Sequence, residues 1–337
     1  MQTYTRQPLS IVRGSGTRVY DLEGREYLDF VGGIAVNVLG HGHPDLVQAI
    51  QRQAAQLIHT SNLYYTEPQA KLAQMLVEHS FADKVFFCNS GAEANEAAIK
   101  LARRYSHGKY GAGRYEIVTM KNSFHGRTFA TLTATGQEKV QKDYEPLLPG
   151  FRYVAFNKFE ELEQAVTDKT AAVLLEPIQG EGGVYVADRE YLKQVRDLCS
   201  KKDVLLMFDE IQTGMGRTGT LFAYEQFGVQ PDVMTLAKGL GGGVPIGACL
   251  ATDSVAKAFS PGSHASTFGG NPLACSAGLA VCRALLEGHV LDHARQMGEY
   301  FVKGLSDCQA RHRVVKEVRG LGLLQGMELD MDAKVVV

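Results

Sequence analysis

The sequence predicts an α/β fold with a mostly parallel central sheet and helices on both of its faces. Short, predominantly apolar runs alternate with helical patterns through the middle of the chain, and this alternation is typical of βαβ units. Runs with little polar interruption are also typical of parallel strands that are buried on both faces. Five runs are predicted as strands of this sheet: residues 84–88, 115–120, 171–176, 203–208 and 233–237.

Helices are predicted where apolar side chains recur three and four residues apart. The clearest case is residues 92–105, where alanine, leucine and tyrosine share one face and Glu96 and Lys100 fall on the other. Further helices are predicted at residues 188–201, 272–287 and 290–310.

The two ends of the chain differ from its middle. Residues 17–30 alternate around the turn residues "DLEG" and predict a β-hairpin. The stretch that begins "HGHPD" reads as a turn and an amphipathic helix, and the end of the chain is helical and then strand-like. We therefore expect a large domain at residues 61–287 and a small α+β domain built from residues 1–60 and 288–337.

Composition indicates an enzyme-sized protein of the cytoplasm. The 337 residues suffice for about two domains. Net charge is −2, with 35 basic and 37 acidic residues well mixed, so no field attracts nucleic acid or a membrane surface. No apolar stretch has the length of a membrane span or a signal peptide core. The six cysteines are scattered without a C-x-x-C pair, which favours reduced, buried thiols.

Ligands of open parallel sheets bind beyond the carboxyl ends of the strands, so the residues that follow each run are informative. After residues 84–88, Ser90 is a good helix N-cap and Glu93 completes a capping box. Gly91 allows a close backbone approach, and the free N–H groups of a helix start bind anions. An ordinary capped helix is the alternative interpretation.

Two further strand ends carry polar groups suited to ligand binding. After residues 115–120, Phe124 or His125 offers a ring that could stack on a planar ligand. Arg127 can bind a carboxylate in bidentate fashion, although most arginines are simply solvated. Asp209 directly follows an apolar run, so it is expected to be desolvated and to need a cationic or hydrogen-bonding partner.

Lys238 follows the next apolar run, about one crossover after Asp209 in the sequence. The two strands are expected to be neighbours, and the two side chains to share a pocket; a structural ion pair is the alternative. The glycines after Lys238 are expected to let the chain turn before "VPIGACLA" re-enters the sheet.

Two other patterns are not expected to bind ligands. Residues 214–219 match G-x-G-x-x-G, but no helix follows them, so they predict a turn rather than a dinucleotide site. "HGHPD" at residues 41–45 places two histidines beside a proline, which favours a turn over a metal site.

Together these strand ends supply an anion-binding helix start, a ring, a buried aspartate, a lysine and a carboxylate-binding arginine. Pyridoxal phosphate (PLP) requires a lysine for its covalent bond, a carboxylate for its pyridine nitrogen, a phosphate cradle and a stacking ring. The set predicts PLP as cofactor and no metal.

The motifs "SGAEANEAAIK", "FHGRT", "EPIQGEGG", "FDEIQTGMGRTG", "LAKGLGGGVPIGA" and "STFGGNPLACSAG" resemble the class III (ω-amino acid) aminotransferases of PLP fold type I. Within that family, the similarity is to the acetylornithine branch of arginine biosynthesis, and it covers essentially the whole chain. The resemblance implies transfer of the terminal amino group of N2-acetylornithine to 2-oxoglutarate, which gives N-acetylglutamate 5-semialdehyde and glutamate.

The resemblance also implies roles for the matching positions. Lys238 would bond covalently to PLP and move the proton, Asp209 would pair with the pyridine nitrogen, and Gln212 would contact the ring hydroxyl. Ser90, Gly91 and Ala92 would bind the phosphate, and Phe124 would stack on the ring. Thr267 would reach the phosphate of a partner subunit, with Ser266 near substrate, so a homodimer with shared active sites is implied. Arg127 would hold the donor carboxylate, and Glu181 would pair with a C-terminal arginine during the donor half-reaction.

The sequence departs from the family pattern at two places. Family members usually continue through a segment that supplies the arginine partner of Glu181, and no arginine follows Arg319 here. We expect that this segment is missing from the sequence rather than that the second half-reaction is impaired. Where the ornithine enzymes place a tyrosine, this chain has Gly33, which leaves room for an acylated amine.

Three alternatives remain open at this stage. Ornithine, succinylornithine or 4-aminobutyrate could be the donor of the same reaction. A glutamate-1-semialdehyde-type aminomutase would share the fold but would need no external acceptor. A module that only binds PLP or a partner protein would lack turnover.

Overall fold

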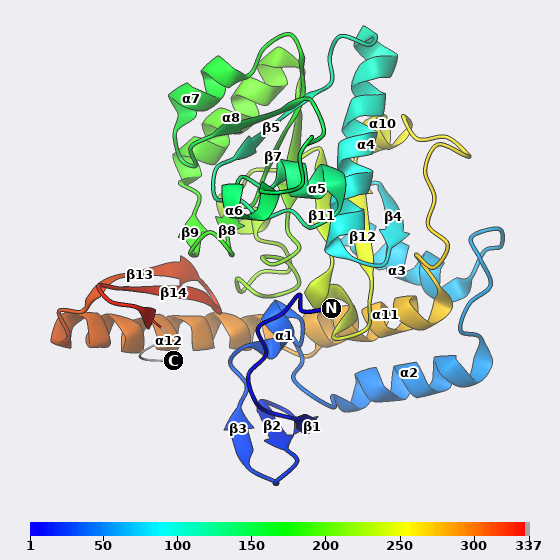
Figure 1. Cartoon of the computed structure of the whole chain (residues 1–337). Helices are drawn as coiled ribbons and strands as arrows, with labels where there is room; N and C mark the ends of the chain where they lie inside the picture. The colour runs from blue at the N-terminus through cyan, green and yellow to red at the C-terminus, as the bar shows by residue number, and fades with distance from the viewer. Residues whose placement is uncertain (334–337) are drawn as a thin grey trace.

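The computed structural model describes residues 1–333, and its centre is a seven-stranded mixed sheet (Figure 1). The strands lie in the order β4 (Lys84–Cys88), β12 (Gly247–Ala251), β11 (Val233–Leu236), β10 (Leu205–Asp209), β7 (Thr170–Leu175), β5 (Glu116–Met120) and β6 (Phe151–Val154). Only β12 runs antiparallel to its neighbours, so the predicted mostly parallel sheet is confirmed. All five predicted strands are present, and β6 was not predicted.

Helices cover both faces of this sheet, as predicted (Figure 1). Five predicted helices match α2 (Pro44–Gln56), α4 (Gly91–Tyr110), α8 (Arg189–Lys202), α11 (Pro272–Glu287) and α12 (Val290–Arg311), of which α4 runs past the predicted end to Tyr110. The remaining helices are α1 (Gly32–Ala35), α3 (Glu67–Glu78), α5 (Phe129–Ala134), α6 (Glu138–Gln141), α7 (Phe159–Ala165), α9 (Tyr224–Phe227), α10 (Asp253–Ala256) and the 3₁₀ turn η1 (Lys238–Gly241).

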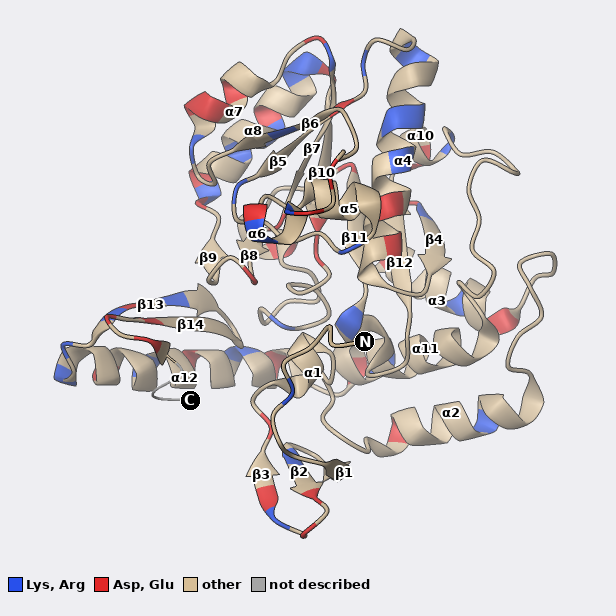
Figure 2. Ribbon diagram, viewed as in Figure 1, with Lys and Arg blue, Asp and Glu red and all other residues tan. Residues whose placement is uncertain are grey.

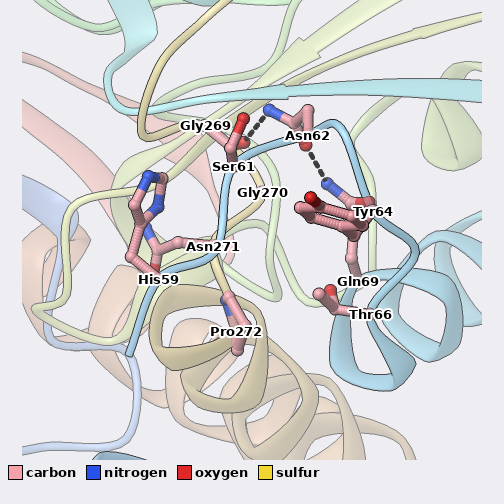
Figure 3. A pocket seen from close by; sticks show the side chains of 10 residues that line it. All are labelled: His59, Ser61, Asn62, Tyr64, Thr66, Gln69, Gly269, Gly270, Asn271 and Pro272. Carbon is pink, nitrogen blue, oxygen red and sulfur yellow. Dashed lines mark hydrogen bonds between the residues drawn. The ribbon is translucent and has the colours of Figure 1, made fainter. Parts of the chain in front are cut away.

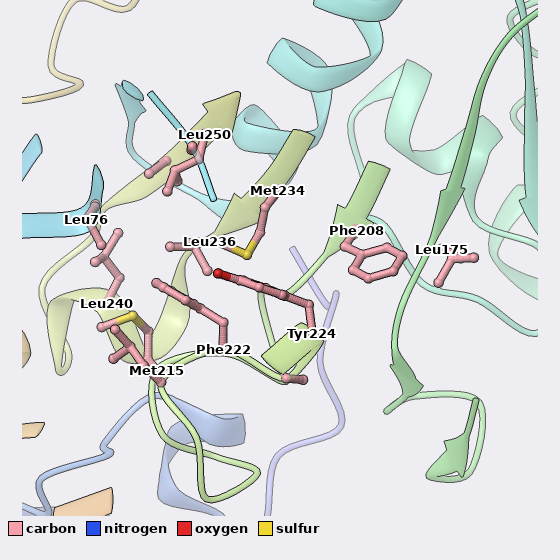
Figure 4. Close-up of a cluster of buried hydrophobic side chains, with 14 of the residues drawn as sticks. Leu76, Leu175, Phe208, Met215, Phe222, Tyr224, Met234, Leu236, Leu240 and Leu250 are labelled. Carbon is pink, nitrogen blue, oxygen red and sulfur yellow. The ribbon is translucent and has the colours of Figure 1, made fainter. Parts of the chain in front are cut away.

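Alternate residues of each strand enter two separate hydrophobic cores. Leu206 and Phe208 of β10 point into the core shared with α8 and α11, whereas Leu205 and Met207 point into the core shared with α4. This follows from the two-residue period of a strand. Figure 4 shows part of the core shared with α8 and α11, where the ring of Phe222 packs beside the strands. The sheet is therefore held rigidly from both sides, and its strand ends are fixed.

Small sheets form at both ends of the chain. The predicted hairpin is β2 (Arg18–Asp21) with β3 (Glu26–Leu28), and β1 (Ile11–Ser15) adds a third antiparallel strand. Near the other end, β13 (Val315–Leu321) pairs with β14 (Leu324–Leu329) alongside α12. A further pair is β8 (Ile178–Gln179) with β9 (Tyr185–Val186).

The two terminal sheets are separate, and no strand pairing joins them within residues 1–333. The rings of Phe30 and Phe301 stack with their centroids 6.3 Å apart, which brings the N-terminal region against α12. The division of the chain into residues 1–60, 61–287 and 288–337 stays a prediction, and residues 334–337 of its last part lie outside the described residues.

Charged residues of both signs are dispersed over all parts of the fold (Figure 2). The six cysteines are free, and five of them are buried, as predicted. Among residues 1–333, no single helix is long and apolar enough to cross a bilayer; α11 and α12 meet the criterion only as a pair bent by 68°.

Candidate active site

The candidate site lies where the parallel strands end. Asp209 is the last residue of β10 and stands in register with Thr235 of the neighbouring parallel strand β11. Lys238 follows β11 as the first residue of η1. The prediction that their strands are neighbours is confirmed. Lys238 has a φ of +43°, a left-handed conformation that side-chain-bearing residues seldom adopt and that often marks functional positions.

The Asp209 carboxylate is buried and held by donors from three segments. Asn95 Nδ2 and His125 Nδ1 each lie 2.7 Å from Asp209 Oδ2. The Ile211 amide donates to Asp209 Oδ1 at 3.1 Å. Thr235 Oγ1 donates in turn to Asn95 Oδ1 at 2.8 Å. This network fixes the carboxylate, and sequence reasoning missed Asn95 because it looks like an ordinary helix residue.

Lys238 is half-buried and makes no ion pair with Asp209 in the described part of the chain, so the structural ion-pair interpretation is wrong. Burial lowers the pKa of Lys238, and the negative charges of Asp209, Glu181 and Glu176 act in the opposite direction. A lysine with a lowered pKa and no salt bridge has an amine that is available for chemistry.

Glu176, which follows β7, belongs to the same strand-end cluster and was missed. Its Oε2 accepts from the Phe124 amide at 3.1 Å, and its Oε1 accepts from the Gly180 amide at 3.3 Å. Burial, together with the charge of Asp209, raises the pKa of Glu176 well above its usual range. The sequence could have pointed to Glu176, because the apolar run 171–176 ends in its carboxylate, just as the run 203–208 leads into Asp209.

The start of α4 has the predicted N-cap, with one correction. Ser90 Oγ accepts from the Glu93 amide at 3.2 Å. Glu93 does not return to the Ser90 amide as a standard capping box requires; its Oε2 accepts from the Asn89 amide at 2.7 Å and from Asn89 Nδ2 at 2.8 Å. The reciprocal bond falls one residue earlier because the Asn89 side chain offers a second donor.

Close packing requires glycine at position 91. A Cβ there would lie 2.8 Å from Ile211 Cδ1. The amides of Gly91 and Ala92 belong to the first helical turn, whose N–H groups have no acceptor within the helix. The helix start therefore presents donors that suit a phosphate.

Around this cluster lie the side chains proposed to meet substrate. Arg127 is exposed, and its Cζ lies 5.4 Å from the centroid of the half-buried Phe124 ring. His125 is buried against Asp209, so of the two candidate stacking rings only Phe124 remains free to stack. Gln212 Nε2 lies 3.4 Å from Glu181 Oε1, and Gly180 makes room for Gln212.

Ser266 and Thr267 occupy different environments. Asn89 Nδ2 donates to Ser266 Oγ at 3.1 Å, which places Ser266 beside the start of α4. Thr267 is exposed on the surface of this chain.

Local structure accounts for the two patterns that were not expected to bind ligands. Residues 214–219 form turns, as predicted, and lead to no adjoining helix. His41 lies with its Nε2 2.7 Å from Asp29 Oδ2 and bridges in strand fashion to Gly16.

Taken together, these side chains fit PLP: amide donors for a phosphate, a fixed buried carboxylate for the pyridine nitrogen, an unpaired lysine for a covalent bond and a free ring for stacking. A family model described as aminotransferase class-III matches residues 1–336. The chain belongs to the class-III aminotransferases. This confirms the predicted enzyme class and cofactor, PLP.

Individual relatives extend this result. An acetylornithine aminotransferase of Caldanaerobacter subterraneus subsp. tengcongensis is 59% identical over 338 residues, covering 100% of this chain and 86% of that protein. The N-acetylornithine aminotransferase structure from Stenotrophomonas maltophilia shares 44% identity and a TM-score of 0.84, over 98% of this chain and 83% of that one. The ornithine aminotransferase structure from Toxoplasma gondii shares 36% identity and a TM-score of 0.95, over 99% of this chain and 80% of that one. These neighbours confirm the predicted fold type.

Proposed function

We propose that this class-III aminotransferase transfers the terminal amino group of N2-acetylornithine to 2-oxoglutarate, as a step of arginine biosynthesis. The products are N-acetylglutamate 5-semialdehyde and glutamate. The observation that carries the choice of donor is the 59% identity, over the whole chain, to a protein named acetylornithine aminotransferase. The reaction itself rests on Lys238 and Asp209 at adjacent strand ends.

PLP, when bound, supplies an electron sink for the bond that breaks at the substrate carbon. Lys238 would hold the cofactor covalently, and its amine would move the proton at that carbon. Its lowered pKa favours the neutral amine that this base role needs. Asp209 places a fixed negative charge at the pyridine nitrogen, and Asn95 and His125 keep it in place.

The remaining cofactor contacts come from neighbouring segments. Ser90, Gly91 and Ala92 hold the phosphate at the start of α4, where the helix dipole also favours an anion. The Phe124 ring stacks on the pyridine, and its loop is held by the bond from its amide to Glu176. Gln212 donates to the ring hydroxyl.

Substrate recognition is assigned to groups that are exposed or half-buried in this chain. Arg127 binds the α-carboxylate of the donor, which places the far amine at the reacting centre. Glu181 pairs with an arginine during the donor half-reaction and releases it for 2-oxoglutarate, and Ser266 lies near substrate. Gly33, whose φ of +66° suits glycine, leaves room for the acetylated amine.

The active unit is proposed to be a homodimer. Large apolar side chains are exposed together with Thr267 on one surface: Leu63 is 83% exposed, Tyr65 104% and Phe268 61%. A patch of this kind indicates a protein interface. Thr267 of one subunit would then reach the phosphate bound by the other. The free, buried thiols support a cytoplasmic location.

Ornithine is the second candidate donor. The TM-score of 0.95 with the Toxoplasma gondii ornithine aminotransferase favours it. The sequence identity favours acetylornithine, at 59% to the Caldanaerobacter protein and 44% to the Stenotrophomonas maltophilia structure, against 36% to the Toxoplasma gondii structure.

The test is an assay of purified enzyme with 2-oxoglutarate and equal concentrations of N2-acetylornithine, ornithine, N2-succinylornithine or 4-aminobutyrate. N2-Acetylornithine should give the highest kcat/KM, because Gly33 admits the acyl group and Arg127 the carboxylate. A higher kcat/KM for any other donor would overturn the assignment of donor.

A further inference from the structure

A turn at residues 266–270 is anchored by one asparagine from a distant segment (Figure 3). Asn62 Nδ2 donates to the carbonyl of Ser266 at 3.1 Å and to the carbonyl of Gly269 at 2.8 Å. Gln69 Nε2, from α3, donates to Asn62 Oδ1 at 2.7 Å. The amide group of Asn62 is thereby oriented, and both of its donors point at the backbone of the turn.

The same turn is tied to the start of α4. Ser266 Oγ accepts from Asn89 Nδ2 at 3.1 Å and from the Gly269 amide at 3.0 Å. Gly269 packs directly on β4, since a Cβ there would lie 2.3 Å from the carbonyl oxygen of Phe87. The base of the turn is therefore fixed between Asn62 and β4.

The tip of the turn points away from these anchors. Thr267 and Phe268 are exposed, as is Leu63, the residue that follows Asn62. The ring of His59 lies 5.4 Å from that of Phe268. Residues 59–65 and the tip of the turn thus form one continuous surface, and the backbone conformation at Thr267 depends on the two carbonyls that Asn62 holds.

We propose that Asn62 is a positioning residue that acts in trans, by holding the Ser266–Gly269 turn so that Thr267 reaches the cofactor phosphate of the partner subunit. This rests on the proposed function, in which Thr267 crosses to the other subunit. Asn62 itself contacts neither cofactor nor substrate. Its effect passes through backbone carbonyls, so it depends on the side-chain amide and not on side-chain size.

The first test is Asn62→Asp, which keeps the shape and the acceptor for Gln69 but replaces both donors with a carboxylate facing two carbonyls. PLP affinity, measured by titration of the apoenzyme, should fall on the order of tenfold, the value of one charge-assisted hydrogen bond to phosphate. Asn157→Asp is the matched control, because Asn157 Nδ2 donates to the carbonyl of Val186 away from this turn. The control should leave PLP affinity unchanged.

Hybrid dimers then separate an effect in trans from a local defect. In one hybrid, Asn62→Asp is in one subunit and Lys238→Ala in the other; in the second, both changes share a subunit and the partner is unchanged. Borohydride reduction attaches PLP only to an intact Lys238, so covalently retained PLP reports one site per dimer. The proposal predicts parental affinity in the first hybrid and about tenfold weaker affinity in the second.

Weaker affinity in the first hybrid only, in both or in neither would overturn the proposal. Thr267→Ala in the same two hybrids tests the underlying function separately. Suppose that Thr267→Ala weakens PLP affinity in the second hybrid only, whereas Asn62→Asp does not show this pattern. The positioning role of Asn62 then fails and the shared site stands. If Thr267→Ala does not act in trans, the shared site itself fails.

Discussion

The two sides of the site differ in how completely this chain builds them. On the cofactor side, Asp209 is 3% exposed and receives hydrogen bonds from Asn95, His125 and the Ile211 amide. On the substrate side, Arg127 is exposed and has no ion pair within residues 1–333. Thr267, assigned to the partner's cofactor, is likewise exposed on this chain. The chemistry is thus set by a rigid sheet edge, whereas recognition uses groups that gain partners from ligands and from a second subunit. Changes on the cofactor side should therefore affect turnover most.

Lys238→Ala should have the largest effect, because no other described amine occupies this strand end. Turnover should fall below about one-thousandth of the parent rate, while PLP still binds without a covalent bond. Assay of kcat and mass spectrometry after borohydride treatment measure both. Lys257→Ala is the control, since Lys257 is exposed at the C-terminal end of α10 and pairs with Asp253. Turnover retained by Lys238→Ala would refute the mechanism.

Asp209→Asn should come next, because it removes the charge at the pyridine nitrogen while keeping the side-chain shape. We expect kcat to fall on the order of 100-fold to 1,000-fold. The side-chain amide introduced by this change accepts the hydrogen bonds of Asn95 and His125 less well than the carboxylate does. The free energy of unfolding should therefore drop by about 1–3 kcal/mol. Chemical denaturation beside kinetics separates the two effects, and an unchanged kcat would show that this carboxylate is not at the ring nitrogen.

Arg127→Lys should have a smaller effect that is confined to the substrate side. Loss of bidentate geometry should raise KM for N2-acetylornithine on the order of tenfold and leave kcat and PLP affinity nearly unchanged. Steady-state kinetics and PLP titration measure these. A tenfold fall in PLP affinity would show that Arg127 contributes to cofactor binding, and the distinction between the two sides of the site would fail.

Glu210→Gln should have the smallest effect on turnover and act on stability. Burial raises the pKa of Glu210 to about 7, and its carboxylate accepts from the amides of Ala223 and Tyr224. Because the folded-state pKa lies above the unfolded value of 4.5, this group's contribution to stability is present at low pH and is lost as pH rises towards about 7.

The difference in unfolding free energy between parent and Glu210→Gln should therefore change across that window, by at most about 3 kcal/mol. Urea unfolding at several pH values measures it, with the exposed Glu163→Gln as control. A difference that stays constant with pH would show that Glu210 does not titrate in this range.

Sequence patterns predicted the parts of the fold that depend on local burial. The strands β5, β7, β10 and β11 are apolar because both of their faces are covered. The edge strand β6 was missed because only Val154 of its four residues is buried and Arg152 interrupts its apolar character. The antiparallel direction of β12 has no signature in its composition, since direction is decided by the connection through η1.

The same limit applies to the site. Lys238 and Asp209 were found because each follows an apolar run. Asn95 was not, because its role depends on α4 crossing the end of β10, and that contact joins residues 114 positions apart. Asn62 likewise acts on a turn 204 residues away. Local sequence specifies strand ends, whereas only tertiary packing specifies which helices and turns meet them.

The most direct test of the central claim is a single half-reaction. PLP-loaded enzyme is mixed with N2-acetylornithine in the absence of any acceptor, and the semialdehyde is counted per Lys238. The account predicts one equivalent of semialdehyde, no further turnover, and one equivalent of glutamate when 2-oxoglutarate is then added. Continued turnover without an acceptor, or no semialdehyde at all, would contradict it.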